Sequence, residues 1–193
     1  MSTDPVAGVA DVIAFANGAE FETWLAENFE HAPGVWLKIA KVGSGIASLT
    51  DQEAVDLGLC YGWISGQRKA LDETHYLQKY VPRRPRSRWS LINVRKVVAL
   101  DAAGLMRPSG VAEVAAAKAD GRWDAAYESQ KLATVPPDLA RALADSPKAA
   151  AAFASLNKTS QYAVIFDLAT TRTLKTRSVH LRKAIAALEE HDA

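Results

Sequence analysis

The sequence of 193 residues contains little cysteine, and this scarcity excludes several kinds of protein. Cys60 is the only cysteine, so the chain has neither an internal disulfide framework nor a cysteine-rich zinc site. A single thiol fits a reducing compartment. With 11 glycines and 8 prolines, the chain is also neither collagen-like nor a proline-rich low-complexity protein.

Positive charge is missing from the start of the chain, and long apolar runs are missing throughout. The first basic residue is Lys38. A secretory signal needs a basic start and a transit peptide needs arginine, so neither is expected. No uninterrupted apolar run reaches roughly 18 residues, the length of a membrane span. We therefore expect a soluble, cytoplasmic protein that binds no membrane.

The composition is that of a globular protein, with 49% hydrophobic and 23% charged residues. In the first half, strand and helix patterns alternate. Residues 11–16 have the composition of a short strand, and residues 35–40 show strand alternation. Asn17 with Glu20, and residues 50–53, form two helix-start signatures.

Two strands, 63–70 and 75–82, are expected to form a hairpin through the connection 71–74. A connection of two or four residues places Ala70 opposite His75. Arg68 then lies on the face of Leu77, whereas Lys69 lies with the aromatic residues Trp63, Tyr76 and Tyr80. A three-residue bulged loop would shift this assignment by one position.

The second half has an almost purely helical pattern. Four helices are expected at 138–145, 147–156, 159–169 and 174–190. The sequence thus predicts an α+β protein. It has a small antiparallel sheet with a hairpin and flanking helices in residues 1–131, and an all-helical C-terminal module in residues 138–193. The two parts could also pack as one unit.

Positive charge is concentrated in residues 66–98, where nine basic and two acidic side chains give a charge of +7. The remainder carries 14 basic and 20 acidic side chains, −6. Arginine grips phosphate or carboxylate and stacks on rings. We therefore expect a groove for an anionic small molecule, nucleic acid or acidic peptide. Its candidate ligand-binding residues are Trp63, Gln67, Arg68, Tyr76, Arg83, Arg84, Arg86 and Trp89. The alternative is a solvated loop whose arginines pair with acidic residues.

Catalytic, metal-binding and cofactor-binding motifs are weak. In a small hydrolase or transferase, Cys60, His75 or Asp72 would supply the proton or nucleophile chemistry, but a cysteine beside Leu59 is more typical of core packing. The four histidines lack metal-ligand spacing. We therefore expect no catalytic residue, no metal and no cofactor. An adaptor that binds a protein partner through the helical tail is a third possibility, and the oligomeric state is open.

Several runs are distinctive, namely residues 59–67, 75–78, 82–90 and 119–124. With them the chain resembles the YdeI/OmpD-associated family of bacterial proteins, including its C-terminal bacteriocin-protection domain. The resemblance implies a link to tolerance of antimicrobial peptides and to envelope stress, without an agreed activity or cofactor. The family commonly has Asp where this chain has Ser65, so a carboxylate that served chemistry in relatives would be missing here.

Overall fold

The structure is a computed structural model that describes residues 11–190. It divides into two compact units. The first contains the residues through Ser87 together with Lys96–Ala116. The second contains Arg88–Arg95 together with the residues from Ala117 onward.

The first unit alternates strands and helices and ends with a hairpin and two helices. The division between the units falls inside those last two helices, α3 and α4. In chain order the elements are β1 (Asp11–Ile13), α1 (Gly18–Asn28), β2 (Val35–Ala40), α2 (Asp51–Cys60), β3 (Trp63–Ala70), β4 (His75–Pro82), α3 (Leu91–Ala102) and α4 (Pro108–Ala119).

The predicted helix starts are confirmed. The side-chain oxygen of Asn17 accepts a hydrogen bond from the backbone N–H of Glu20 at 3.0 Å, which caps α1. Thr50 and Glu53 form a complete capping box at the start of α2, each side chain accepting a bond from the other residue's backbone N–H. Such boxes satisfy N–H groups that lack a partner inside the helix.

The four strands form one mixed sheet in the order β1-β2-β4-β3. β1 runs parallel to β2, whereas the β2–β4 and β3–β4 pairs are antiparallel. The prediction of a purely antiparallel sheet was therefore wrong at its β1 edge. The reason is α1, because a connection that contains a helix can return the chain so that the next strand runs in the same direction. The strand predicted for residues 11–16 also ends earlier, at Ile13.

The hairpin has the predicted strand bounds but not the predicted register. Near the turn Ala70 pairs with Tyr76, one position away from the expected partner, and the register shifts again between Ser65 and Arg68. This shift is a bulge in β3, in which one extra residue moves the following side chains to the other face. Arg68 therefore shares a face with Tyr76, and Lys69 lies on the opposite face.

Gln78 stabilises this bulge from inside the protein. It is 4% exposed. Its side-chain nitrogen donates to the carbonyl oxygens of Gly66 and Gln67 at 3.0 and 3.2 Å. Its side-chain oxygen accepts a bond from Nε of Arg68 at 2.7 Å. A buried amide thus satisfies carbonyl groups that the interrupted ladder leaves without strand partners.

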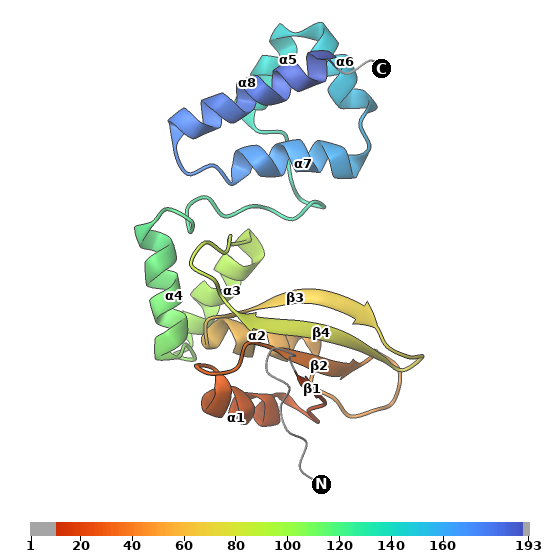
Figure 1. Cartoon of the computed structure of the whole chain (residues 1–193), viewed down its shortest axis with the longest axis vertical. Helices are drawn as coiled ribbons and strands as arrows, with labels where there is room; N and C mark the ends of the chain where they lie inside the picture. Colours follow the sequence, from red (N-terminus) through yellow and green to blue (C-terminus); the bar gives the residue numbers. More distant parts are fainter. Residues whose placement is uncertain (1–10, 191–193) are drawn as a thin grey trace. The chain divides into compact units, whose positions relative to one another are not determined.

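Helices α1 and α2 pack on one face of the sheet (Figure 1). The core there is aromatic. Phe21 contacts Tyr80 with ring centroids 6.0 Å apart, and Trp24 meets Trp63 edge to face at 5.8 Å. Because large rings bury 150–250 Å² each, about four of them supply much of the burial that a small unit needs.

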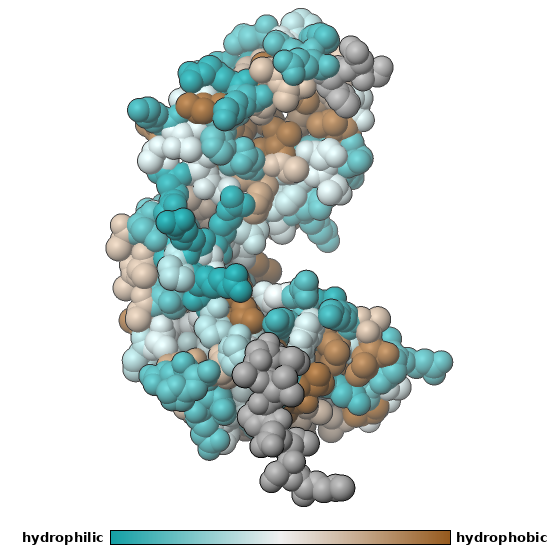
Figure 2. Space-filling model, viewed as in Figure 1, coloured by the Kyte–Doolittle hydropathy of each residue, from teal (hydrophilic) through white to brown (hydrophobic). Residues whose placement is uncertain are grey.

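The second unit is helical, and the four predicted helices are confirmed within one residue at each end. Short linkers and proline starts separate them, as expected for helix boundaries. The elements are α5 (Pro137–Asp145), α6 (Pro147–Ser155), α7 (Lys158–Ala169) and α8 (Leu174–Glu190). Figure 2 shows hydrophobic side chains gathered between α7 and α8, with hydrophilic ones on the outer sides of these helices.

The core of this helical unit is small and mostly aliphatic, with Leu139, Ala149 and Leu168 fully buried and Phe153 7% exposed. A charge pair links its helices. Nε and Nη2 of Arg177 on α8 donate to the two carboxylate oxygens of Asp138 on α5, at 2.6 and 2.8 Å. Nη1 of the same guanidinium donates to the Leu168 carbonyl oxygen at 2.7 Å. One side chain therefore joins three helices.

The part of the chain that the structure describes contains no helix long and apolar enough to cross a membrane.

Candidate functional site

The two tryptophans predicted to stack on a ligand lie in the interior. Trp63 is 1% exposed and donates its indole N–H to the Phe29 carbonyl oxygen at 3.3 Å. Trp89 is 2% exposed and packs edge to face against Trp123 at 5.1 Å in the second unit. Neither ring has a face open to a ligand, so the stacking role does not fit the structure. Burial of such large apolar rings stabilises the fold, and both tryptophans are used for packing.

Arg68 and Tyr76 are brought together, but by an acidic partner. Nη2 of Arg68 lies 2.5 Å from Oδ1 of Asp51, and its guanidinium carbon lies 4.5 Å from the Tyr76 ring centroid. The Tyr76 hydroxyl donates to the same carboxylate oxygen at 3.4 Å. Burial, and then the Asp51 charge, raise the pKa of Tyr76. The guanidinium is therefore already neutralised by a carboxylate at the start of α2.

The arginine-rich segment, residues 83–88, contains a turn. The backbone N–H of Arg84 donates to Oγ of Ser87 at 3.0 Å, and the Ser87 N–H donates back to the Arg84 carbonyl oxygen at 2.9 Å. Arg83 is buried, at 6% exposed. The side chains of Arg84, Arg86 and Gln67 are exposed. Whether these three contact an anion stays a prediction.

The charge is also divided differently from the sequence window. The first unit has 10 basic and 13 acidic residues, a net charge of −3, and the second has 13 basic and 9 acidic residues, +4. The +7 window spans both, because Arg88 and Arg95 belong to the second unit. The helical unit therefore carries the net positive charge of the chain, although the basic sequence window lies mostly in the first unit.

The helical unit contains a cavity of about 480 Å³ at the turn between α7 and α8, which we call the turn pocket. Its volume lies within the range of small-molecule sites. Basic, acidic and hydroxyl side chains line it: Arg88, Asp120, Asp167, Thr170, Thr171, Arg172, Thr173, Thr176 and His180.

Both carboxylates of the turn pocket have cationic or imidazole partners. Nε of the buried Arg122 donates to both Asp120 oxygens at 2.8 and 2.7 Å, and this bond lowers the pKa of Asp120. The carboxylate of Asp167 lies 2.7 Å from Nδ1 of His180. The guanidinium groups of Arg88 and Arg172 complete the charged lining, and the charge of Arg172 also lowers the pKa of Asp120.

Arg88 and Arg172 reach the turn pocket from separate segments. The guanidinium carbon of Arg88 lies 4.9 Å from the Phe166 ring centroid on α7. Arg172 lies in the short turn before α8, whose first residues are capped by Oγ1 of Thr173 through the N–H of Thr176. The candidate list did not include either arginine. In the sequence, Arg172 stands between two threonines at a joint between two helices. Basic residues are common near helix ends because they interact favourably with the helix dipole, so this pattern did not point to a ligand.

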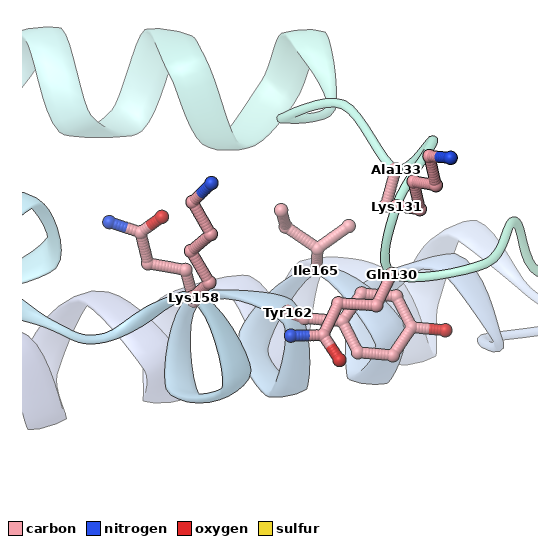
Figure 3. Close-up of a pocket in the computed structure, with 7 residues that line it drawn as sticks. Gln130, Lys131, Ala133, Lys158, Tyr162 and Ile165 are labelled. Atoms are coloured by element: carbon pink, nitrogen blue, oxygen red, sulfur yellow. The ribbon is translucent and has the colours of Figure 1, made fainter.

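A smaller cavity, of about 250 Å³, lies between α7 and the preceding linker (Figure 3). Lys158 and Ile165 project from α7, and Lys131 extends from the linker on the other side. Its remaining lining residues are Gln130, Ala133, Gln161 and Tyr162. Its two amides are already used, since Gln130 donates to Thr159 and Gln161 to the Phe153 carbonyl oxygen. The turn pocket is larger and carries guanidinium groups, so we take it as the candidate site.

Cys60 lacks the environment of a nucleophile. The residue is 4% exposed, and burial raises the pKa of its thiol. A catalytic cysteine needs a lowered pKa and access to substrate. The interpretation of this cysteine as core packing fits the structure.

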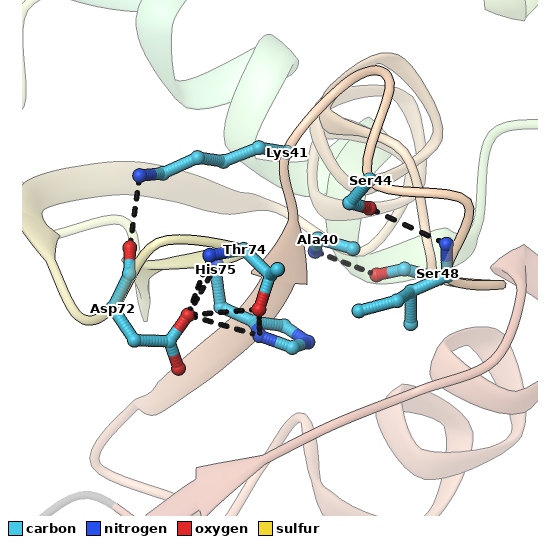
Figure 4. A network of polar contacts seen from close by, with 8 residues as sticks. Ala40, Lys41, Ser44, Ser48, Asp72, Thr74 and His75 are labelled. Carbon is cyan, nitrogen blue, oxygen red and sulfur yellow. Dashed lines mark hydrogen bonds and ion pairs between the residues drawn. The ribbon is translucent and has the colours of Figure 1, made fainter.

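Asp72 and His75, the other two groups considered for chemistry, form the hairpin turn (Figure 4). Oδ1 of Asp72 accepts bonds from the backbone N–H groups of Thr74 and His75, at 2.8 and 2.7 Å. Nδ1 of His75 lies 2.9 Å from the Thr74 hydroxyl. These contacts are those of an Asx turn, in which a carboxylate holds the backbone.

Family models match both parts of the chain. Residues 13–113, more than half of the chain, match a model described as a domain of unknown function, DUF8412. The chain belongs to this family. Residues 133–191 match the model described as bacteriocin-protection, YdeI or OmpD-associated, which confirms the resemblance for this segment. No curated protein and no solved structure matches the chain.

The YdeI/OmpD-associated match places the turn pocket largely inside that segment, since α7 and α8 both lie within residues 133–191. The runs 59–67, 75–78 and 82–90, which suggested the family, lie instead in the DUF8412 segment. The resemblance is therefore confirmed in the helical part and replaced by a second family in the part with the sheet.

Proposed function

We propose that this protein binds a small phosphate-bearing metabolite in the turn pocket of its helical unit. The observation that carries the proposal is a cavity of about 480 Å³ whose lining brings together two guanidinium groups, Arg88 and Arg172, from separate segments of the chain. Guanidinium forks match phosphate oxygens in pairs of charge-assisted hydrogen bonds.

The rest of the lining supports the same ligand class. Thr173 and Thr176 place the first turn of the 17-residue helix α8 at the cavity, where a helix favours negative charge. The Phe166 ring beneath Arg88 holds that guanidinium by a cation–π contact. The proposal keeps the arginine and aromatic chemistry expected from the sequence, but moves it to different residues.

The description of the matched family includes bacteriocin protection. Two arginines and two aspartates balance in the lining, so the turn pocket offers a cationic peptide no net electrostatic attraction. We propose that any protective effect depends on the bound metabolite, through regulation or metabolism.

Isothermal titration calorimetry of the full chain tests the proposal, with inorganic phosphate and a nucleoside monophosphate as probes at low salt. Loss of one guanidinium in Arg172→Ala should weaken binding by about tenfold or more. Arg182→Ala is the matched control, because Arg182 is exposed on α8 outside the pocket lining. Equal affinity of the parent and Arg172→Ala, or equal losses in both variants, would contradict the proposal.

A further inference from the structure

The sheet of the first unit has one face that α1 and α2 do not cover, which we call the open sheet face. The strand register places Trp36 directly opposite Lys79, and Lys38 opposite Leu77. On the other edge of β4, Lys69 of β3 also pairs with Leu77. Because side chains alternate along a strand, these residues project from the same side. The core residues Val35 and Leu37 project from the other.

Two ammonium groups lie over the single tryptophan of this face. Nζ of Lys69 is 4.8 Å from the centroid of the Trp36 ring, and Nζ of Lys79 is 5.6 Å from it. The ring is half-buried. Lys79 reaches the ring from the adjacent strand β4, and Lys69 reaches it from β3, one strand further, so the register of three strands holds an aromatic surface and two cations together.

Among the described residues, the strand positions around Trp36 on the open sheet face carry no carboxylate, and the nearest one along β4 is that of Asp72, which contacts His75 at the hairpin end. Within residues 11–190, Lys38, Lys69 and Lys79 form no ion pair with a carboxylate. The neighbouring positions on the same side are apolar, with Val12 beside Trp36, and Val81 beside Ile64. The contrast with Arg68, which is neutralised by Asp51 on the opposite face, is sharp.

We propose that the open sheet face binds single-stranded nucleic acid. Phosphate groups draw the ammonium groups of Lys69 and Lys79 away from the indole, and the uncovered Trp36 ring stacks on a base. Lys38 contacts a further phosphate. A single strand is favoured because its bases offer free ring faces, whereas a duplex buries them in its own stack. This site lies in the first unit, so its test is independent of the test of the turn pocket.

Fluorescence anisotropy with a 5′-labelled oligothymidine of 15 nucleotides tests the proposal, using the full chain at low salt. The double variant Lys69→Ala/Lys79→Ala should lose about tenfold or more in affinity, and its log–log salt slope should fall by about 1.4, or 0.7 per lost phosphate contact. Lys148→Ala/Lys175→Ala removes two exposed lysines from the other unit and is the matched control for charge.

Trp36 requires a second variant whose folding is checked. Trp36→Leu should keep the salt slope but weaken binding several-fold through lost stacking, with circular dichroism confirming the fold. Unchanged affinity in the Lys69→Ala/Lys79→Ala variant, equal loss in the control pair, or preference for a duplex of the same length would overturn the proposal. Binding to vesicles of anionic phospholipid without binding to the oligonucleotide would also overturn it, in favour of a lipid surface.

Discussion

The core clusters of the two units are built from side chains of different size. In the first unit, Phe21, Trp24, Trp63 and Tyr80 form the interface between the helices and the sheet. The helical unit packs alanine and leucine side chains in its centre and joins its helices through Arg177. A flat sheet face needs large side chains to fill the layer beneath its helices, whereas helices can approach closely over small ones.

The two units also differ in how their cationic side chains are arranged. The first unit, with a net charge of −3, isolates three lysines on one sheet face, and the second, at +4, concentrates guanidinium groups around a cavity. Net charge therefore does not locate a site. The position of each cation relative to its nearest carboxylate does, because a paired cation is largely neutralised before a ligand arrives.

The largest effect is expected at the joint between α2 and α4 in the first unit. A methyl group on Gly110 would overlap the carbonyl oxygen of Cys60 and lie 2.9 Å from that of Leu59. Backbone atoms cannot move away as a side chain can, so Gly110→Ala should cost about 3 kcal/mol or more of the free energy of unfolding. Urea unfolding followed by tryptophan fluorescence measures it.

Gly66→Ala is the control for this variant, since its methyl group would meet only ordinary contacts, the nearest at 3.7 Å. If both variants lose the same free energy, close packing of α4 on the end of α2 is not the cause. If the two units unfold separately, the loss should be confined to the transition of the first unit.

A smaller effect is expected in the helical unit. Arg177→Ala removes both bonds to Asp138 and the bond to the Leu168 carbonyl oxygen. Hydrogen bonds to charged groups contribute about 1.5–3 kcal/mol, and partial exposure of the pair limits the expected loss to about 2 kcal/mol. Chemical unfolding followed by circular dichroism measures it, with Arg182→Ala as the control. A loss equal to that of the control would show that the small aliphatic core holds the helices without this pair.

The smallest effect is a pH dependence at the hairpin tip. Bonds from the backbone N–H of Thr74, then from its hydroxyl and from His75, lower the pKa of Asp72 from 3.8 to about 2. The folded state thus favours the carboxylate, and the resulting stability is present above pH 3.8 and is lost as the pH falls toward 2.

Asp72→Asn should therefore be less stable than the parent at neutral pH, and the difference in melting temperature should shrink as the pH falls through this range. A difference that stays constant down to pH 2 would mean that the negative charge is not what holds the turn.

Local patterns predicted much of this fold. Helix starts at Asn17 and Thr50, and the four C-terminal helices, follow from capping residues and apolar spacing, which act within one or two turns. The strand bounds of the hairpin follow from composition and turn residues in the same way. The direction of β1 could not be predicted from local patterns, because it depends on where α1 returns the chain.

The candidate site was harder to predict than the fold. Arginines next to tryptophans in the sequence suggested a shared surface, but Trp63 and Trp89 are buried in different units. Trp36, which does lie beside two lysines, is 33 and 43 positions away from them in the sequence. Such pairing depends on strand register, and a single bulge changes it.

The bulge of β3 decides which of two adjacent cations has a carboxylate. It directs Arg68 toward Asp51 and leaves Lys69 above Trp36. In a relative that gained or lost one residue between positions 65 and 68, the residue at position 69 would face the Asp51 carboxylate and the one at position 68 would face the tryptophan. The overall composition of the chain would hardly change. Along this hairpin, insertions and deletions are therefore expected to alter ligand preference more than point substitutions do.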